Sequence, residues 1–134
     1  MKLTSRYRFS ASHRLDTPAL TPEENRRLFG KCNNPHGHGH DYLLEITVDG
    51  PVDQDGQVVN REAMDALVRE HVLARLDHRN LNADIRELAG SVTTTENLAT
   101  VVQGALAGAW TLPARLARVR ISETARNTFE LEVR

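Results

Sequence analysis

The sequence lacks several features that would assign it to a class at once. It has one cysteine, and among its 134 residues only one tryptophan, two tyrosines and three phenylalanines. A lone cysteine cannot form an internal disulfide, which favours a reducing compartment. The formal net charge of -1 provides no attraction to nucleic acids or membrane surfaces. No apolar run follows Met1, and none approaches membrane-spanning length. We therefore expect a soluble, cytoplasmic protein that binds neither nucleic acids nor membranes.

Apolar periodicity predicts one α+β domain over residues 1–134. Four segments alternate as strands do, and two carry apolar residues at helical spacing. Asn60 can cap the first helix, while Thr93 and Glu96 have capping-box spacing at the start of the second, which Pro113 closes. Residues 14–30 form a polar loop in this interpretation. The order β-β-α-α-β-β predicts an antiparallel sheet with two helices on one face. The expected elements are residues 2–13, 42–48, 61–76, 94–112, 117–121 and 129–133.

The segment KCNNPHGHGHDY, residues 31–42, concentrates histidines with glycine between them. If a strand begins by His38, alternation places His38 and His40 on one face. His13 ends the first strand, on the face that carries its apolar residues. Antiparallel pairing of the two strands would bring His13 opposite the start of the second strand. Three neutral imidazoles around one ion are typical of catalytic zinc. A flexible turn without a ligand role is the alternative, and spacing also permits a pair of His36 with His38.

Cys32 lies in a loop rich in glycine and asparagine, not on an apolar stripe. Most lone cysteines are small buried hydrophobic residues. Here Lys31 and a bound divalent cation would both favour the thiolate. Such a thiolate could act as a fourth ligand, a nucleophile or a general base, and the spacing leaves these three roles open.

Two acidic positions are further candidates. Asp77 precedes His78 where the first helix ends, and adjacent helical side chains do not face each other. A direct contact between them therefore requires a broken last turn, and otherwise His78 simply suits the helix C-terminus. Glu123 continues the parity of the apolar strand before it, so its carboxylate points to the covered face and needs a partner. A ligand with guanidine-like N–H pairs would satisfy both oxygens.

Together, five motifs resemble the 6-pyruvoyltetrahydropterin synthase family, which includes the 6-carboxytetrahydropterin synthases of queuosine biosynthesis. They are FSASHRL, FGKCNNPHGHGHDY, LDHRNLN, TTTENLA and ISET, in this order along the chain. The resemblance implies the tunnelling fold (T-fold), in which subunits join edge to edge into a barrel. It also implies a homohexamer, built as a dimer of trimers, with active sites at subunit interfaces.

The resemblance further implies roles for individual residues. It assigns Zn²⁺ to His13, His38 and His40, and makes Cys32 the catalytic base. Asp77 and His78 become its proton-relay partners. Glu123 becomes the anchor of the pterin ring nitrogens. Thr95 and Glu96 match a segment near the pterin, although the capping box already accounts for Glu96.

The family chemistry is a zinc-dependent lyase reaction on 7,8-dihydroneopterin triphosphate. Loss of triphosphate with internal redox gives 6-pyruvoyltetrahydropterin, whereas side-chain cleavage gives the 6-carboxy product and acetaldehyde. Five residues separate Cys32 from the HGH at 38–40, which is the spacing of the pyruvoyl branch. However, His36 also creates the C-x3-H-G-H pattern of the carboxy branch. The pyruvoyl product is favoured here.

Two other functions fit the histidines alone. A three-histidine zinc hydrolase or hydratase would use metal-bound hydroxide and would not need Cys32. A non-enzymatic metal-binding module would hold several ions through His36, His38 and His40, and would have no affinity for pterins.

Overall fold

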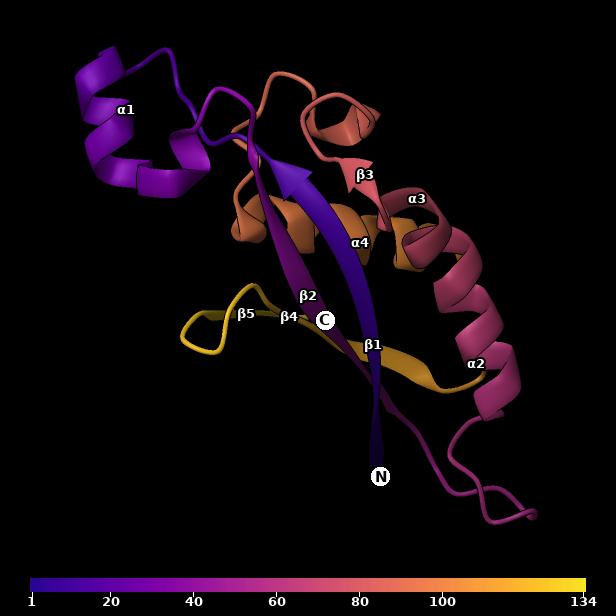
Figure 1. Cartoon of the computed structure of the whole chain (residues 1–134). Coiled ribbons are helices and arrows are strands. Elements are labelled where there is room, and N and C mark those ends of the chain that lie inside the picture. Colours follow the sequence, from indigo (N-terminus) through magenta and orange to yellow (C-terminus); the bar gives the residue numbers. More distant parts are fainter.

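The computed structural model describes residues 1–134 and contains one five-stranded sheet with the order β3-β1-β2-β4-β5 (Figure 1). The two long strands β1 (Lys2–His13) and β2 (His38–Asp49) pair antiparallel, as predicted. Two further antiparallel strands, β4 (Arg115–Ser122) and β5 (Thr128–Glu132), follow on the side of β2. The short β3 (Arg79–Asn80) pairs parallel to the end of β1. The sheet is therefore mixed, and β3 is its one unpredicted strand.

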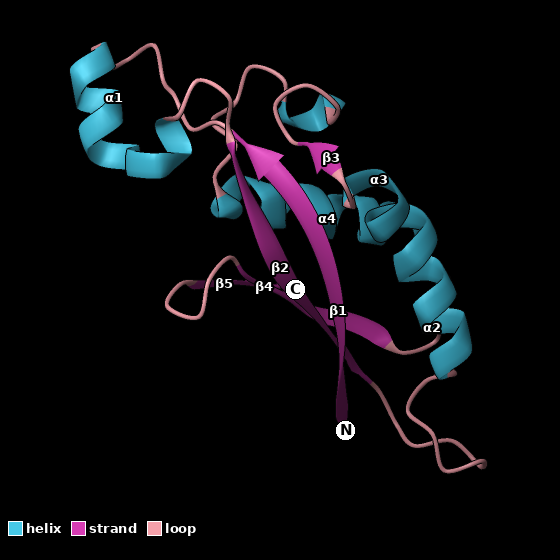
Figure 2. Ribbon diagram, viewed as in Figure 1, coloured by secondary structure: helices cyan, strands magenta, loops and turns pink.

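Helices cover one face of this sheet (Figure 2). A continuous helical rod is formed by α2 (Arg61–Val68), a π-helical turn (Arg69–Leu73) and α3 (Ala74–Leu76), and α4 (Thr95–Ala109) lies beside it. A fourth helix, α1 (Pro22–Phe29), projects away from the sheet and is followed by a 3₁₀ turn (Gly30–Asn33). A second 3₁₀ turn spans Arg86–Leu88. None of these helices combines the length and apolar character that crossing a membrane requires.

Helix starts agree with the sequence in one place and differ in two. Asn60 caps α2, as predicted, because its side chain accepts from the backbone N–H of Ala63. The capping box expected between Thr93 and Glu96 is wrong, since Thr94 caps α4 instead. The polar loop expected over residues 14–30 contains α1. A capping box between Thr21 and Glu24 starts that helix, with proline at its first position.

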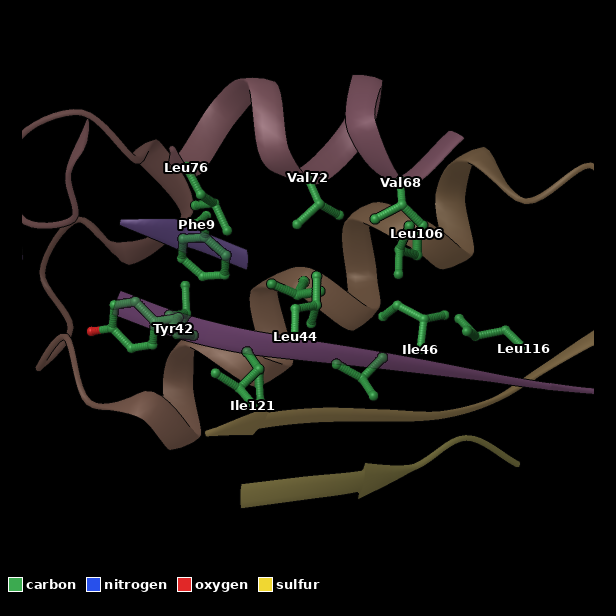
Figure 3. Packing of buried hydrophobic residues seen from close by; sticks show 14 of the residues in the cluster. Phe9, Tyr42, Leu44, Ile46, Val68, Val72, Leu76, Leu106, Leu116 and Ile121 are labelled. Atoms are coloured by element: carbon green, nitrogen blue, oxygen red, sulfur yellow. The ribbon is translucent and has the colours of Figure 1, made fainter. Parts of the chain in front are cut away.

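The core lies between the sheet and the helical layer (Figure 3). Leu44, Ile46 and Val48 of β2 are fully buried against the apolar sides of the helices. The opposite face of the sheet is polar: there Glu45 lies 3.3 Å from Arg6 Nε and 3.7 Å from Arg120 Nε. β2 is thus enclosed on both faces from residue 44 to residue 48. Its first residues extend beyond this enclosed section, to the place where the candidate site is built.

Candidate metal centre and active site

Two histidines from neighbouring strands form the centre of the site. His13 ends β1 and His40 lies near the start of β2, and their Nε2 atoms are 3.2 Å apart. His13 is completely buried, and its Nδ1 lies 2.8 Å from the carbonyl oxygen of Thr93. Because a carbonyl only accepts, Nδ1 donates, and the Nε2 lone pair of neutral His13 points toward His40. A second hydrogen bond that fixes the tautomer in this way is typical of metal-binding histidines.

A cysteine and a carboxylate complete the cluster. Cys32 Sγ lies 3.6 Å from His40 Nε2. Glu123 Oε1 lies 3.3 Å from His40 Nε2 and 3.7 Å from His13 Nε2. The four potential ligand atoms all lie within 4.8 Å of one another. Nitrogen, sulfur and oxygen donors at this separation suit a tetrahedral ion such as zinc. The residues present therefore fit the metal that the sequence predicts.

The loop that carries Cys32 is tied to the end of β1. The backbone N–H of Leu15 donates to the carbonyl of Cys32 at 2.7 Å. The buried side-chain amide of Asn33 donates to the carbonyl of Leu15 at 2.7 Å and to Asp16 Oδ1 at 3.0 Å. These bonds hold the thiol beside the histidines although no regular strand or long helix carries it.

Burial sets the protonation of the cluster. It lowers the pKa of His40 to about 4, with help from His13 and His38, and also lowers the pKa of His13. Both imidazoles are therefore neutral near pH 7, which is the form that binds a metal. Burial, followed by the charge of Glu123, raises the pKa of the Cys32 thiol. The surroundings of Cys32 thus favour the thiol rather than the thiolate expected beside Lys31, and a bound cation would act in the opposite direction.

The other two histidines of the segment lie outside this cluster. His38 is paired with His13 across the strands, and its ring packs edge-on against His40 with 4.8 Å between centroids. It lies beside the four-atom group without belonging to it. His36 is exposed in the preceding turn, where its backbone N–H donates to Asn34 Oδ1. Of the two, only His38 packs against a residue of the cluster.

Asp77 and His78 do contact each other, through the broken helical turn that the sequence required. Asp77 leaves the helix with ψ 128°, and His78 is the only non-glycine residue with positive φ, at 61°. The Nδ1 of His78 lies 3.0 Å from Asp77 Oδ1. Ser10 holds both residues: its N–H donates to Asp77 Oδ1 and its carbonyl accepts from the His78 N–H. Backbone strain of this kind is concentrated at functional sites.

An open hollow of about 510 Å³ has both His40 and His78 in its lining. The rest of the lining is mostly polar and comes from β1, β2, β3 and Asp84, whereas His13, Cys32 and Glu123 do not line it. Asp77 and His78 form no hydrogen bond or ion pair with Cys32, Glu123 or either histidine of the cluster. Within one chain they are therefore not bonded to the thiol that they are predicted to assist.

The remaining predicted residues lie at the start of α4. Thr95 is buried, and its hydroxyl has no hydrogen-bond partner, whereas Glu96 is exposed in the first turn of the helix. Sequence reasoning overlooked Tyr42. This residue is fully buried, its hydroxyl also lacks a partner, and its ring centroid is 5.6 Å from that of His40. The sequence did place Tyr42 on the same strand face as His38 and His40. However, a tyrosine at this position is indistinguishable from an ordinary core residue in the sequence pattern.

Known proteins resemble this chain over nearly its whole length. Residues 2–133 match the model of the family described as 6-pyruvoyl tetrahydropterin synthase. A 6-pyruvoyl tetrahydrobiopterin synthase from Drosophila melanogaster is 44% identical over 93% of this chain and 75% of its own. The Homo sapiens enzyme of that name is 45% identical over 75% and 70%, respectively. The solved structure of Caenorhabditis elegans 6-pyruvoyl tetrahydropterin synthase is 35% identical, with a TM-score of 0.91 over 100% of this chain and 96% of that one.

Proposed function

This chain belongs to the 6-pyruvoyl tetrahydropterin synthase family, and from that premise we propose that it is a zinc-dependent lyase. Its substrate would be 7,8-dihydroneopterin triphosphate, and its products 6-pyruvoyltetrahydropterin and triphosphate. The observation that carries this proposal is the cluster of His13, Cys32, His40 and Glu123, whose ligand atoms lie within 4.8 Å of one another. One small site thus offers metal ligands, a base and an acceptor for ring N–H groups.

His13, His38 and His40 would hold the metal. The fixed tautomer of His13 and the lowered pKa of His40 support two of these assignments. His38 would supply the third nitrogen, since its ring already packs against His40. When bound, zinc would act as a Lewis acid and as a template for the side-chain oxygens of the substrate.

The protein groups would bind the ring and move protons. The Glu123 carboxylate would accept the paired N–H groups of the pterin ring, as the sequence suggests, with the buried Thr95 and the nearby Glu96 as further contacts. Cys32 would remove a proton from the side-chain carbon beside the metal-held oxygen. Triphosphate then leaves, and the two electrons released by oxidation of the side chain reduce the ring, so no external oxidant is needed.

Asp77 and His78 would relay the protons. Their direct contact and the strained backbone of His78 support this role. Within one chain they form no hydrogen bond or ion pair with Cys32, which supports a site completed at a subunit interface. Edge strands support this as well, because β3 pairs with only the last residues of β1 and the outer side of β5 is unpaired. We therefore expect a homohexamer whose sheets join edge to edge. Because its single cysteine is free, we also propose that the protein is cytoplasmic.

The test is to incubate the zinc-loaded protein with 7,8-dihydroneopterin triphosphate and to identify the products by mass spectrometry. We expect triphosphate with 6-pyruvoyltetrahydropterin. The 6-carboxy product with acetaldehyde would instead show the queuosine branch of the family. Replacing Cys32 by alanine should lower the rate about 10²- to 10⁴-fold, as loss of a general base does. Full activity of this variant would favour the zinc hydrolase alternative.

Metal analysis tests the ligands independently of activity. We expect one zinc per chain in the wild-type protein and almost none in His13→Ala, because the bond to the Thr93 carbonyl orients the free ring nitrogen of His13 toward the other ligands. His36→Ala is the matched control: this histidine lies in the same segment but is exposed, so its zinc content should stay unchanged. Several ions per chain that survive His13→Ala would instead indicate a metal-binding module.

A further inference from the structure

The hydroxyl of Tyr42 has no partner inside the protein. Tyr42 is fully buried, and its oxygen forms no hydrogen bond. The ring packs normally: it stacks on Phe9 with 4.9 Å between centroids and belongs to the apolar cluster. Only the hydroxyl departs from core packing, because it points away from that cluster (Figure 3). A buried donor without an acceptor lowers stability, so phenylalanine would be the better residue at this position for folding alone.

The hydroxyl faces the site, not the core. The register that pairs Leu43 with Ser122 brings the next residue, Glu123, beside Tyr42 on the same face of the sheet. On the other side along β2, the ring of Tyr42 packs against His40. Tyr42 therefore stands next to the carboxylate that is proposed to bind the pterin ring.

A phenol is protonated near pH 7 and can donate one hydrogen bond. The ligand proposed for Glu123 has an acceptor in a suitable place: in a pterin, a ring carbonyl adjoins the two N–H groups that a carboxylate accepts. The carboxylate covers the donors of this edge but leaves the carbonyl without a donor. A hydroxyl beside Glu123 would complete the recognition of all three groups.

We propose that Tyr42 is a substrate-recognition residue whose hydroxyl donates to the ring carbonyl next to the N–H pair bound by Glu123. This inference rests on the proposed function, since it assumes a pterin in the site. It explains why the protein retains a buried hydroxyl without a partner: the acceptor arrives with the ligand.

The experiment compares Tyr42→Phe with Tyr7→Phe in the zinc-loaded protein. Tyr7 is the matched control because its hydroxyl is already used, in a 2.7 Å hydrogen bond to Asp65 Oδ1 between β1 and α2. Calorimetric titration would measure affinity for neopterin and for its 2,4-diamino analogue, which has an amino group in place of the ring carbonyl and no hydrogen on the adjacent ring nitrogen, so the quantity compared is the effect of each substitution on each ligand. Thermal unfolding without ligand would be measured on the same samples.

For Tyr42→Phe we expect about tenfold weaker binding of neopterin, the value of one hydrogen bond. The preference of the wild-type protein for neopterin over the diamino analogue should shrink by the same factor. The ligand-free melting temperature should stay equal or rise, because an unpaired donor is removed. Tyr7→Phe should show the reverse pattern, with a lower melting temperature and unchanged affinity for both ligands.

Three results would overturn the inference. One is unchanged neopterin affinity in Tyr42→Phe, and another is an equal loss for both ligands, which would place the hydroxyl on some group other than the carbonyl. The third is a loss of affinity together with a lower melting temperature, which would make Tyr42 a structural residue. Turnover of 7,8-dihydroneopterin triphosphate by the wild-type protein, assayed separately, decides the proposed function, so failure of that proposal is distinguishable.

Discussion

The two ends of β2 show the same strand used in two ways. On the helix-covered face, Leu44, Ile46 and Val48 are followed toward the N-terminal end by Tyr42, His40 and His38. The apolar end meets apolar side chains of the helices and of β4, and its side chains have no polar requirement to meet. The histidine end brings imidazole nitrogens, a thiol and a carboxylate together, and the hydroxyl of Tyr42 beside them lacks an internal partner.

Burial serves stability at one end of the strand and binding at the other. At the apolar end, burial removes hydrocarbon from water and stabilises the fold. At the histidine end, the same burial holds imidazoles in their neutral form and leaves hydroxyls of Tyr42 and Thr95 unpaired. Groups that the protein itself does not satisfy are available to a metal or a substrate. The site is thus a continuation of the core in which the packing partners come from outside the chain.

The largest effect in this comparison should come from the apolar end. We expect Leu44→Ala to lower the free energy of unfolding by about 3 kcal/mol, because a fully buried side chain is removed and a cavity remains. Denaturant titration in the presence of a chelator would measure this. His38→Ala at the other end of the strand is the control, and it should cost about 1 kcal/mol or less, since His38 is only half-buried. Equal losses in the two variants would contradict the distinction.

The second effect is a pH dependence confined to the histidine end. In the metal-free protein, burial lowers the pKa of His40 from 6.5 to about 4. The unfolded chain therefore binds more protons between these pH values, and the free energy of unfolding should decrease as pH falls from about 6.5 to 4. The stabilisation should be complete above pH 6.5. The lowered pKa of His13 acts in the same direction.

Chemical denaturation across this pH range, again with a chelator, would detect the dependence. The slope should be shallower in His40→Gln, which has no titrating ring. Leu44→Ala should keep the wild-type slope although its stability is lower at every pH, because it leaves the histidines in place. A wild-type slope retained in His40→Gln would show that other groups are responsible.

The smallest effect should come from the uncovered face of the same strand. Glu45 there contacts both Arg6 and Arg120, and the side chain of Arg6 is 73% exposed. Arg6→Ala should therefore cost less than about 1 kcal/mol, as for other exposed ion pairs, and the difference should diminish at high salt. Denaturant titration at two salt concentrations would measure it, with Thr4→Ala as a neighbouring control. A loss that matches that of Leu44→Ala would mean that this face stabilises the subunit as much as the core does.

Much of this fold and part of its site could be predicted from residue patterns alone. Strand alternation placed His13, His40 and Glu123 on the covered face, and the structure brings all three together. The cap at Asn60 was equally readable. The start of α4 could not be predicted from the sequence in this way, because Thr93, Thr94 and Thr95 are all suitable caps. Thr93 instead uses its carbonyl to hold His13, eighty residues away, and the next threonine becomes the cap.

The face of an element on which each residue lies follows from the amino-acid order alone, since alternation and helical spacing depend only on the local backbone. The tertiary structure decided which of these residues meet. The orientation of His13 by a backbone carbonyl, the approach of Cys32 on a loop tied to β1, and the strained contact of Asp77 with His78 all depend on segments distant in the chain. Tyr42 is the clearest case. Its parity predicts burial, but only the packed structure shows that its hydroxyl is left without a partner beside the site.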